Sequence, residues 1–87
     1  MIYVGIDVAK DKHDCCIMNA KSEFLDEIFT ISNTLEEFNN LFLKISTTSQ
    51  ELSNIKVGLE ATGHYSYNLL GFLLDKGLTP IVINPLV

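Results

Sequence analysis

The chain has 87 residues, a formal net charge of −5 and 47% hydrophobic residues. This composition indicates one small globular domain with a single core, and it excludes a disordered chain or two independent domains. The six basic residues are all lysines, face eleven acids and form no cluster, so we expect that this surface does not hold nucleic acid by itself.

The first half of the chain predicts three strands in a meander. Residues 2–9 alternate in strand fashion, and the near absence of charge before Asp7 favours a central strand covered on both faces. A turn at 10–12 leads to a second strand at 13–19, and a link at 20–22 leads to a third at 23–31. Such short links predict antiparallel pairing. Acids within the third strand are typical of an exposed edge.

A helix is expected next, because Thr34 and Glu37 have the spacing of a capping box. Apolar residues then recur at three- and four-residue spacing and form one stripe that should lie on the sheet: Leu35, Phe38, Leu41, Phe42 and Ile45. The polar run at 46–49 predicts the end of this helix.

The second half predicts two crossover units. A fourth strand is expected at 54–61, and a second helix at 64–76 is so rich in leucine that we expect burial on more than one side. Gly77 should end that helix in a left-handed conformation. A fifth strand at 79–84 follows, before a turn at Asn84-Pro85. Right-handed crossovers then give a ribonuclease H-like α/β fold, with a mixed five-stranded sheet in the order 3-2-1-4-5.

Two acids stand out within the apolar strands, Asp7 and Glu60. Each follows a glycine by two residues, Gly5 or Gly58, and residues two apart share a face, so open space is expected beside each carboxylate. A lone acid in an apolar strand is costly unless it is paired, hydrogen-bonded or bound to a cation. Because the first and fourth strands should be parallel neighbours, the two acids are predicted to form half of a metal site. The alternative is that each acid marks a strand end and is solvated.

The remaining polar residues carry weaker predictions. Several near the two acids are interpreted as ordinary surface or packing residues: Lys10, Asp11, Lys12, Asp14, His64 and Tyr65. For His64 and Tyr65, an approach to a substrate from the start of the second helix stays open. The adjacent cysteines, Cys15 and Cys16, should point to opposite faces of a strand as core or half-core fillers, without a disulfide.

The sequence also carries expectations about location. Unpaired cysteines suit a reducing compartment. The chain starts without a basic leader, and no apolar run approaches the length of a membrane span. We therefore expect a cytoplasmic protein with no membrane partner.

Three segments, 5–11, 58–65 and 83–85, together resemble the N-terminal part of the DEDD insertion-sequence transposases. This group is related to the Piv/MooV invertases and is known also as the bridge-RNA-guided recombinases. The resemblance implies a RuvC-like nuclease domain in which four acids hold divalent metal, Mg²⁺ or Mn²⁺, for cutting and joining DNA. Asp7 matches the first acid and Glu60 the second, so both are implied to be catalytic residues and metal ligands.

The same resemblance implies that the third and fourth acids, and a further domain with a serine for strand exchange, lie beyond Val87. Residues 1–87 are then one domain, the N-terminal part of a longer transposase that acts on DNA and, in the guided subgroup, with a guide RNA. The 87-residue chain itself is expected to bind metal weakly, to cleave no DNA and to form a homo-oligomer.

Two rival functions stay open. An actin-like or sugar-kinase ATP-binding half domain begins with the same strand and aspartate, but its phosphate-binding turn is rich in Gly, Ser and Thr. The turn at residues 9–13 contains none of these. A non-catalytic module that associates with itself is the second rival, favoured by the incomplete set of acids and by apolar surface left exposed.

Overall fold

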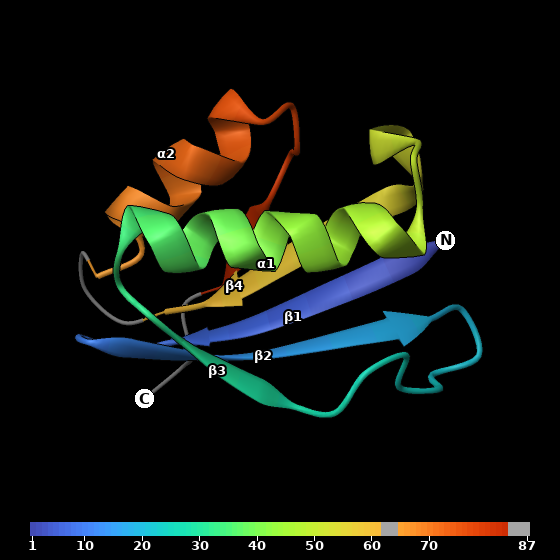
Figure 1. Cartoon of the computed structure of the whole chain (residues 1–87), viewed down its shortest axis with the longest axis horizontal. Coiled ribbons are helices and arrows are strands. Elements are labelled where there is room, and N and C mark those ends of the chain that lie inside the picture. Colours follow the sequence, from blue (N-terminus) through green and yellow to red (C-terminus); the bar gives the residue numbers. More distant parts are fainter. Residues whose placement is uncertain (62–64, 84–87) are drawn as a thin grey trace.

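The structure, a computed structural model, describes residues 1–61 and 65–83. Within this part of the chain, a five-stranded sheet lies against two helices (Figure 1). The elements in chain order are β1 (Ile2–Val8), β2 (Lys12–Asn19), β3 (Phe29–Ser32), α1 (Leu35–Thr48), the 3₁₀ helix η1 (Leu52–Asn54), β4 (Ile55–Glu60), α2 (Tyr67–Asp75) and β5 (Ile81–Ile83). The predicted turn at Asn84-Pro85 lies outside the described residues.

The strand order is β3-β2-β1-β4-β5, which confirms the predicted mixed sheet. Strand β2 is antiparallel to β1 and β3, whereas β4 is parallel to β1 and β5. A short link after β1 and a longer loop at 20–28 after β2 connect the antiparallel pairs, and the helical crossovers produce the parallel ones. The parallel alignment of β1 with β4 places Asp7 level with Glu60.

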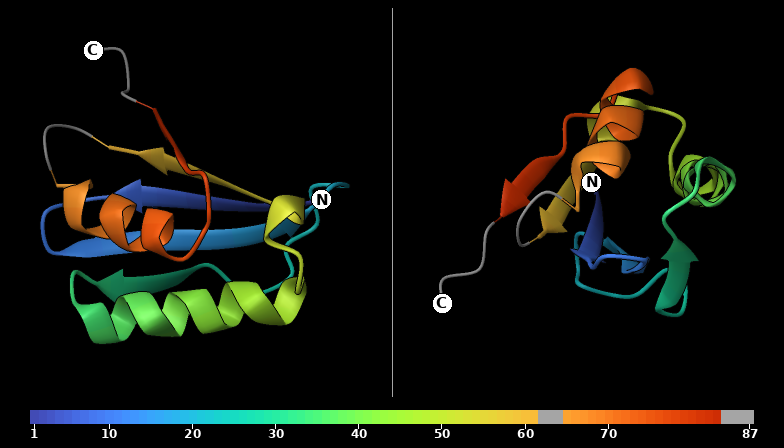
Figure 2. Two further views of the ribbon diagram at one scale, coloured as in Figure 1. Left: turned by 90° about the horizontal axis from the view of Figure 1, so that it is seen from above. Right: turned by 90° about the vertical axis from the view of Figure 1, so that its left-hand side faces the viewer.

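Both helices pack on one face of the sheet (Figure 2). The core lies between them and the alternate residues of the strands, among them Val4, Ile6 and Leu59, which are buried. On the opposite face of β1, Tyr3 is 40% exposed and Asp7 is exposed. The prediction that β1 is covered on both faces is therefore wrong, because no element among the described residues covers this second face. We call it the open face.

The third strand is shorter than predicted. Strand β3 covers only Phe29–Ser32, and Phe24 makes no more than an isolated bridge to Met18. The side-chain oxygen of Asn19 accepts hydrogen bonds from the backbone N–H groups of residues 21 and 23 and so forms a tight turn. Asp26 then pairs with Lys44 of α1 at 2.9 Å. The acids at 23–27 thus lie in a loop tied to α1, not in an edge strand.

Helix α1 begins where the capping box predicted. The hydroxyl of Thr34 accepts a hydrogen bond from the backbone N–H of Glu37 at 3.3 Å. In a full capping box the Glu37 side chain would accept a hydrogen bond from the backbone N–H of Thr34. Here that N–H donates to the carbonyl oxygen of Ser32 instead, at 2.9 Å.

The predicted end of α1 is confirmed, because the helix ends at Thr48, inside the polar run at 46–49. The three hydroxyls of residues 46–48 donate to carbonyl oxygens three or four residues earlier, at 2.6–2.8 Å. Leu35, which was placed in the apolar stripe, is 65% exposed, whereas the other four stripe positions pack inward as expected.

Helix α2 is buried on one side only, so the prediction of burial on more than one side is wrong. Leu69 and Leu73 are fully buried, but Leu74 is 53% exposed and Gly71 is exposed. Helix α2 has nine residues and buries one stripe of side chains against the sheet. Its high leucine content therefore does not require a second packing partner. Gly77 has φ 87°, which confirms the left-handed stop.

Candidate metal centre

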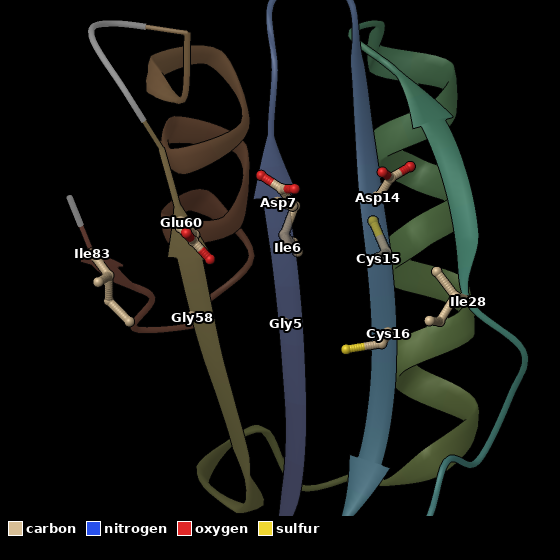
Figure 3. A pocket seen from close by; sticks show the side chains of 10 residues that line it. All are labelled: Gly5, Ile6, Asp7, Asp14, Cys15, Cys16, Ile28, Gly58, Glu60 and Ile83. Atoms are coloured by element: carbon tan, nitrogen blue, oxygen red, sulfur yellow. The ribbon is translucent and has the colours of Figure 1, made fainter. Parts of the chain in front are cut away.

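Three carboxylates lie in one row across neighbouring strands. The strand register pairs Asp7 of β1 with Glu60 of β4 and also with Asp14 of β2. All three are exposed, and paired residues share a face, so the row lies on the open face. Figure 3 shows Asp7 between Glu60 and Asp14. The predicted placement of Asp7 and Glu60 on adjacent parallel strands is confirmed, while their role as ligands stays a prediction.

A hollow of about 400 Å³ lies beside this row (Figure 3). Its floor includes Gly5 and Gly58, which pair with each other on β1 and β4. A Cβ placed on Gly58 would meet nothing closer than the Cδ1 of Ile83 at 4.0 Å. At Gly5 the equivalent Cβ would lie 3.1 Å from the Sγ of Cys16. The expected open space is therefore present beside Glu60, whereas Cys16 occupies it beside Asp7.

The charges around the hollow have one sign. Its lining contains Asp7, Asp14 and Glu60 and no basic residue. Within the described residues, no group of three or more His, Cys, Asp or Glu side chains is arranged to hold a metal ion. Two neighbouring carboxylates nevertheless offer the hard oxygen donors that Mg²⁺ and Mn²⁺ prefer, with water completing the coordination. The donor chemistry fits such a cation, and the set of donors is partial.

Asp14 is the member of the row that the sequence reasoning set aside. The hydroxyl of Thr30 on β3 donates to Asp14 Oδ1 at 2.8 Å, which fixes the carboxylate at the side of the hollow. A sequence signal for this position exists. Paired residues in an antiparallel hairpin lie equally far from the centre of the turn. A turn centred between residues 10 and 11 therefore pairs Asp7 with Asp14.

The two cysteines confirm the prediction of opposite faces and free thiols. Cys15 is buried in the core, and Cys16 is half-buried on the open face. Burial, and to a smaller extent the neighbouring Asp14 and Cys16, together raise the pKa of the Cys15 thiol to about 12. Cys15 is therefore a neutral core side chain that supplies no thiolate to a soft metal.

None of the other polar candidates that the structure describes lines the hollow. Lys10, Asp11 and Lys12 are exposed in or beside the turn after β1. Tyr65 is 37% exposed and takes part in an interaction of its own. His64 lies outside the described residues.

The fold is shared with several solved structures at low sequence identity. The chain is similar to the fowlpox virus Holliday junction resolvase, with 20% identity and a TM-score of 0.60 over 98% of this chain and 62% of that one. It is similar to Thermus thermophilus RuvC, with 12% identity and a TM-score of 0.62 over 98% and 62%. Archaeoglobus fulgidus Pelota gives 12% identity and a TM-score of 0.64 over 99% and 27%. These likenesses place the chain in the RuvC-like class of folds.

The family follows from the sequence itself. Residues 4–87 match the family model DEDD_Tnp_IS110, described as "Transposase", and the chain belongs to this family of DEDD transposases. No curated protein sequence matches it. The chain spans between 27% and 65% of the length of the similar solved structures. Among its described helices, none has the length and apolar character needed to cross a membrane.

Proposed function

We propose that this chain is the N-terminal part of the nuclease domain of a DNA transposase, in which Asp7 and Glu60 are catalytic residues and ligands of Mg²⁺ or Mn²⁺. The observation that carries the proposal is the register that pairs these acids on adjacent central strands, on the open face beside a glycine floor. Membership of the DEDD transposase family supports the substrate class, DNA.

The two acids have one task in this proposal. Their carboxylates hold and orient a divalent cation at the carboxyl ends of β1 and β4, and Gly58 keeps the space next to Glu60 free. A bound metal pair supplies activation of an attacking oxygen and stabilisation of the leaving oxygen.

The 87-residue chain by itself is proposed to bind the metal weakly and to cleave no DNA. Two carboxylates leave most coordination positions to water. The net charge of −5 also repels a polyanion. Contact with DNA, and with a guide RNA in the guided subgroup, is therefore proposed only for a longer protein with a basic surface. The free thiols support the proposed cytoplasmic location.

The test combines metal binding with a nicking assay. Millimolar Mg²⁺ is expected to shift amide resonances at the carboxyl ends of β1 and β4, and Asp7→Asn or Glu60→Gln should remove these shifts. Glu51→Gln is the matched control, because Glu51 is exposed beside η1 and away from the acid row. Supercoiled plasmid should stay intact with the pure chain. Nicking that disappears in Asp7→Asn would show that two acids suffice for cleavage. It would overturn the proposal that the 87-residue chain carries only half of the metal site.

The second candidate is a non-catalytic module that associates with itself. It is favoured by apolar side chains exposed on and beside the open face, since Ile28, Ile81 and Ile83 are each more than half exposed. The two candidates are compatible, and we propose that the chain forms a homo-oligomer in either case. The ATP-binding alternative finds no such support, because the N–H of Ala9 in the first turn is already bonded to Lys12 and His13.

A further inference from the structure

His13 has a fully buried polar side chain to which the proposed function gives no task. It belongs to β2, and its exposed neighbours Lys12 and Asp14 lie on the open face, so the imidazole lies on the helical side of the sheet. There its ring stacks on Phe38 of α1, with 6.2 Å between the ring centroids. A buried polar group is costly unless its polar atoms have hydrogen-bond partners. The partners of the two ring nitrogens therefore indicate what the residue does.

Both ring nitrogens have partners, and together these partners select one tautomer. The backbone N–H of Ala9 donates to Nδ1 of His13 at 3.3 Å. A backbone N–H cannot accept, so Nδ1 has no hydrogen, and the neutral ring has its hydrogen on Nε2. Nε2 lies 3.2 Å from Oδ1 of Asn33, which can only accept. The tautomer with hydrogen on Nε2 satisfies both contacts, and the other tautomer satisfies neither.

These contacts join three segments that meet at one end of the sheet (Figure 1). Ala9 follows β1, His13 lies near the start of β2, and Asn33 links β3 to α1. The N–H of Ala9 is shared with the carbonyl oxygen of Lys12, at 3.2 Å. The backbone N–H of Asn33 donates to the carbonyl oxygen of Asp11 at 3.0 Å. Asn33 therefore holds the turn after β1 through its backbone and, by way of His13, through its side chain.

The carboxylate of Asp7 has no such support of its own. Asp14 is fixed by the hydroxyl of Thr30 at 2.8 Å. Within residues 1–61 and 65–83, by contrast, no hydrogen bond or ion pair to the Asp7 side chain is formed. Metal ligands are usually oriented by hydrogen-bonded neighbours. The direction of the Asp7 carboxylate therefore depends on how firmly the backbone at the end of β1 is held.

His13 lies where it can hold that backbone. Asp7 precedes Ala9 by two residues and pairs with Asp14, which directly follows His13 in the sequence. Val8 pairs with His13 as the last pair of the hairpin. We infer that His13 is a positioning residue for Asp7: its imidazole, with hydrogen on Nε2, fixes the end of β1 against the start of α1 and so sets the direction of the Asp7 carboxylate. The inference rests on the metal role proposed for Asp7.

Two substitutions separate the two contacts of His13. The amide oxygen of His13→Asn can take the place of Nδ1 and accept from Ala9, but this shorter side chain does not reach Asn33. His13→Gln has the opposite property, because its amide can donate to Asn33 but leaves the N–H of Ala9 with Lys12 alone. Asparagine leaves the larger cavity, so a merely structural role makes His13→Asn the more disruptive change. The positioning role predicts the reverse order at Asp7.

The first measurement needs no metal. Nitrogen-15 spectra of the wild-type imidazole at pH 8 should show the hydrogen on Nε2, and a nitrogen–nitrogen coupling across the hydrogen bond should join Ala9 to Nδ1 of His13. Residual dipolar couplings of the Asp7 and Val8 amides should match the wild type in His13→Asn and differ in His13→Gln. Ile45→Val is the control, because it opens a small cavity in the same core without touching either contact. It should keep the wild-type couplings.

The second measurement adds Mn²⁺. Paramagnetic broadening of the Asp7 amide, followed at increasing Mn²⁺ concentration, reports the affinity of the site. His13→Asn and Ile45→Val should bind like the wild type. His13→Gln should weaken binding by about tenfold, as expected when a group that orients a metal ligand is lost. Urea unfolding of each variant shows that these affinities do not follow stability.

Three results would overturn the inference. They are a hydrogen on Nδ1 of wild-type His13, dipolar couplings of Asp7 that His13→Gln leaves unchanged, and a larger change in His13→Asn than in His13→Gln. The first is measured on the wild type, so it decides even where a variant does not fold. A wild type that binds no Mn²⁺ would refute the metal proposal, whereas the metal-free couplings would still decide whether His13 fixes Asp7.

Discussion

Replacing Gly58 by alanine should stabilise the chain, although Gly58 lies in the centre of the sheet. The new Cβ would meet only the Cδ1 of Ile83, at 4.0 Å, which is ordinary van der Waals contact. Relief of the glycine entropy should raise the free energy of unfolding by about 0.5–1 kcal/mol. For a domain of this size the midpoint temperature should rise by roughly 2–8 °C.

Gly5→Ala is the matched control on the neighbouring strand. Its Cβ would lie 3.1 Å from the Sγ of Cys16, so that thiol has to move by a few tenths of an ångström. Leaving its rotamer costs about 0.5–1.5 kcal/mol, which offsets the entropy gain, and no net stabilisation is expected. Urea unfolding of both variants, at the same low micromolar concentration, measures the difference. A Gly58→Ala variant less stable than the wild type, or equal effects at both positions, would refute this reasoning.

Three further effects follow from contacts on the helical side of the sheet. Leu41→Ala should lower the free energy of unfolding by about 2–5 kcal/mol, because Leu41 is 0% exposed and its removal leaves a cavity. Thr34→Ala should cost about 0.5–2 kcal/mol through loss of the cap on Glu37 N–H; Thr34→Ser should restore most of it. Burial raises the Cys15 pKa from 9.0 to about 12, so urea midpoints should fall from pH 9 upward, and a Cys15→Ala variant should lack this component.

The strand order could be predicted because it depends on local signals. The predicted three-residue links at 10–12 and 20–22 permit little besides antiparallel neighbours, and a capped amphipathic helix between two strands gives a parallel crossover. The glycine-x-acid pattern also placed Asp7 and Glu60 correctly, since side-chain alternation and parallel register follow from the strand assignments alone.

The errors arise where tertiary contacts or side-chain hydrogen bonds replace local preference. The loop before β3 is fixed by Asn19 and by the pair of Asp26 with Lys44, which lies 18 residues away in the sequence.

Composition also overstated burial. The leucine-rich run of α2 was interpreted as a helix with two packed sides, yet only the stripe with Leu69 and Leu73 is covered. The apolar start of β1 was interpreted in the same way, yet its Tyr3 and Asp7 side chains lie on the open face. Hydrophobic content sets how much surface can be buried, whereas the number of available packing partners sets how much is buried.

The central claim is that Asp7 and Glu60 together hold a divalent cation, and paramagnetic line broadening by Mn²⁺ tests it most directly. Substoichiometric Mn²⁺ is expected to broaden the amide resonances nearest Asp7 and Glu60 first. The effect should be reduced in Asp7→Asn and in Glu60→Gln, and kept in Glu51→Gln. Broadening spread evenly over the eleven acids, or unchanged in both site variants, would contradict the account.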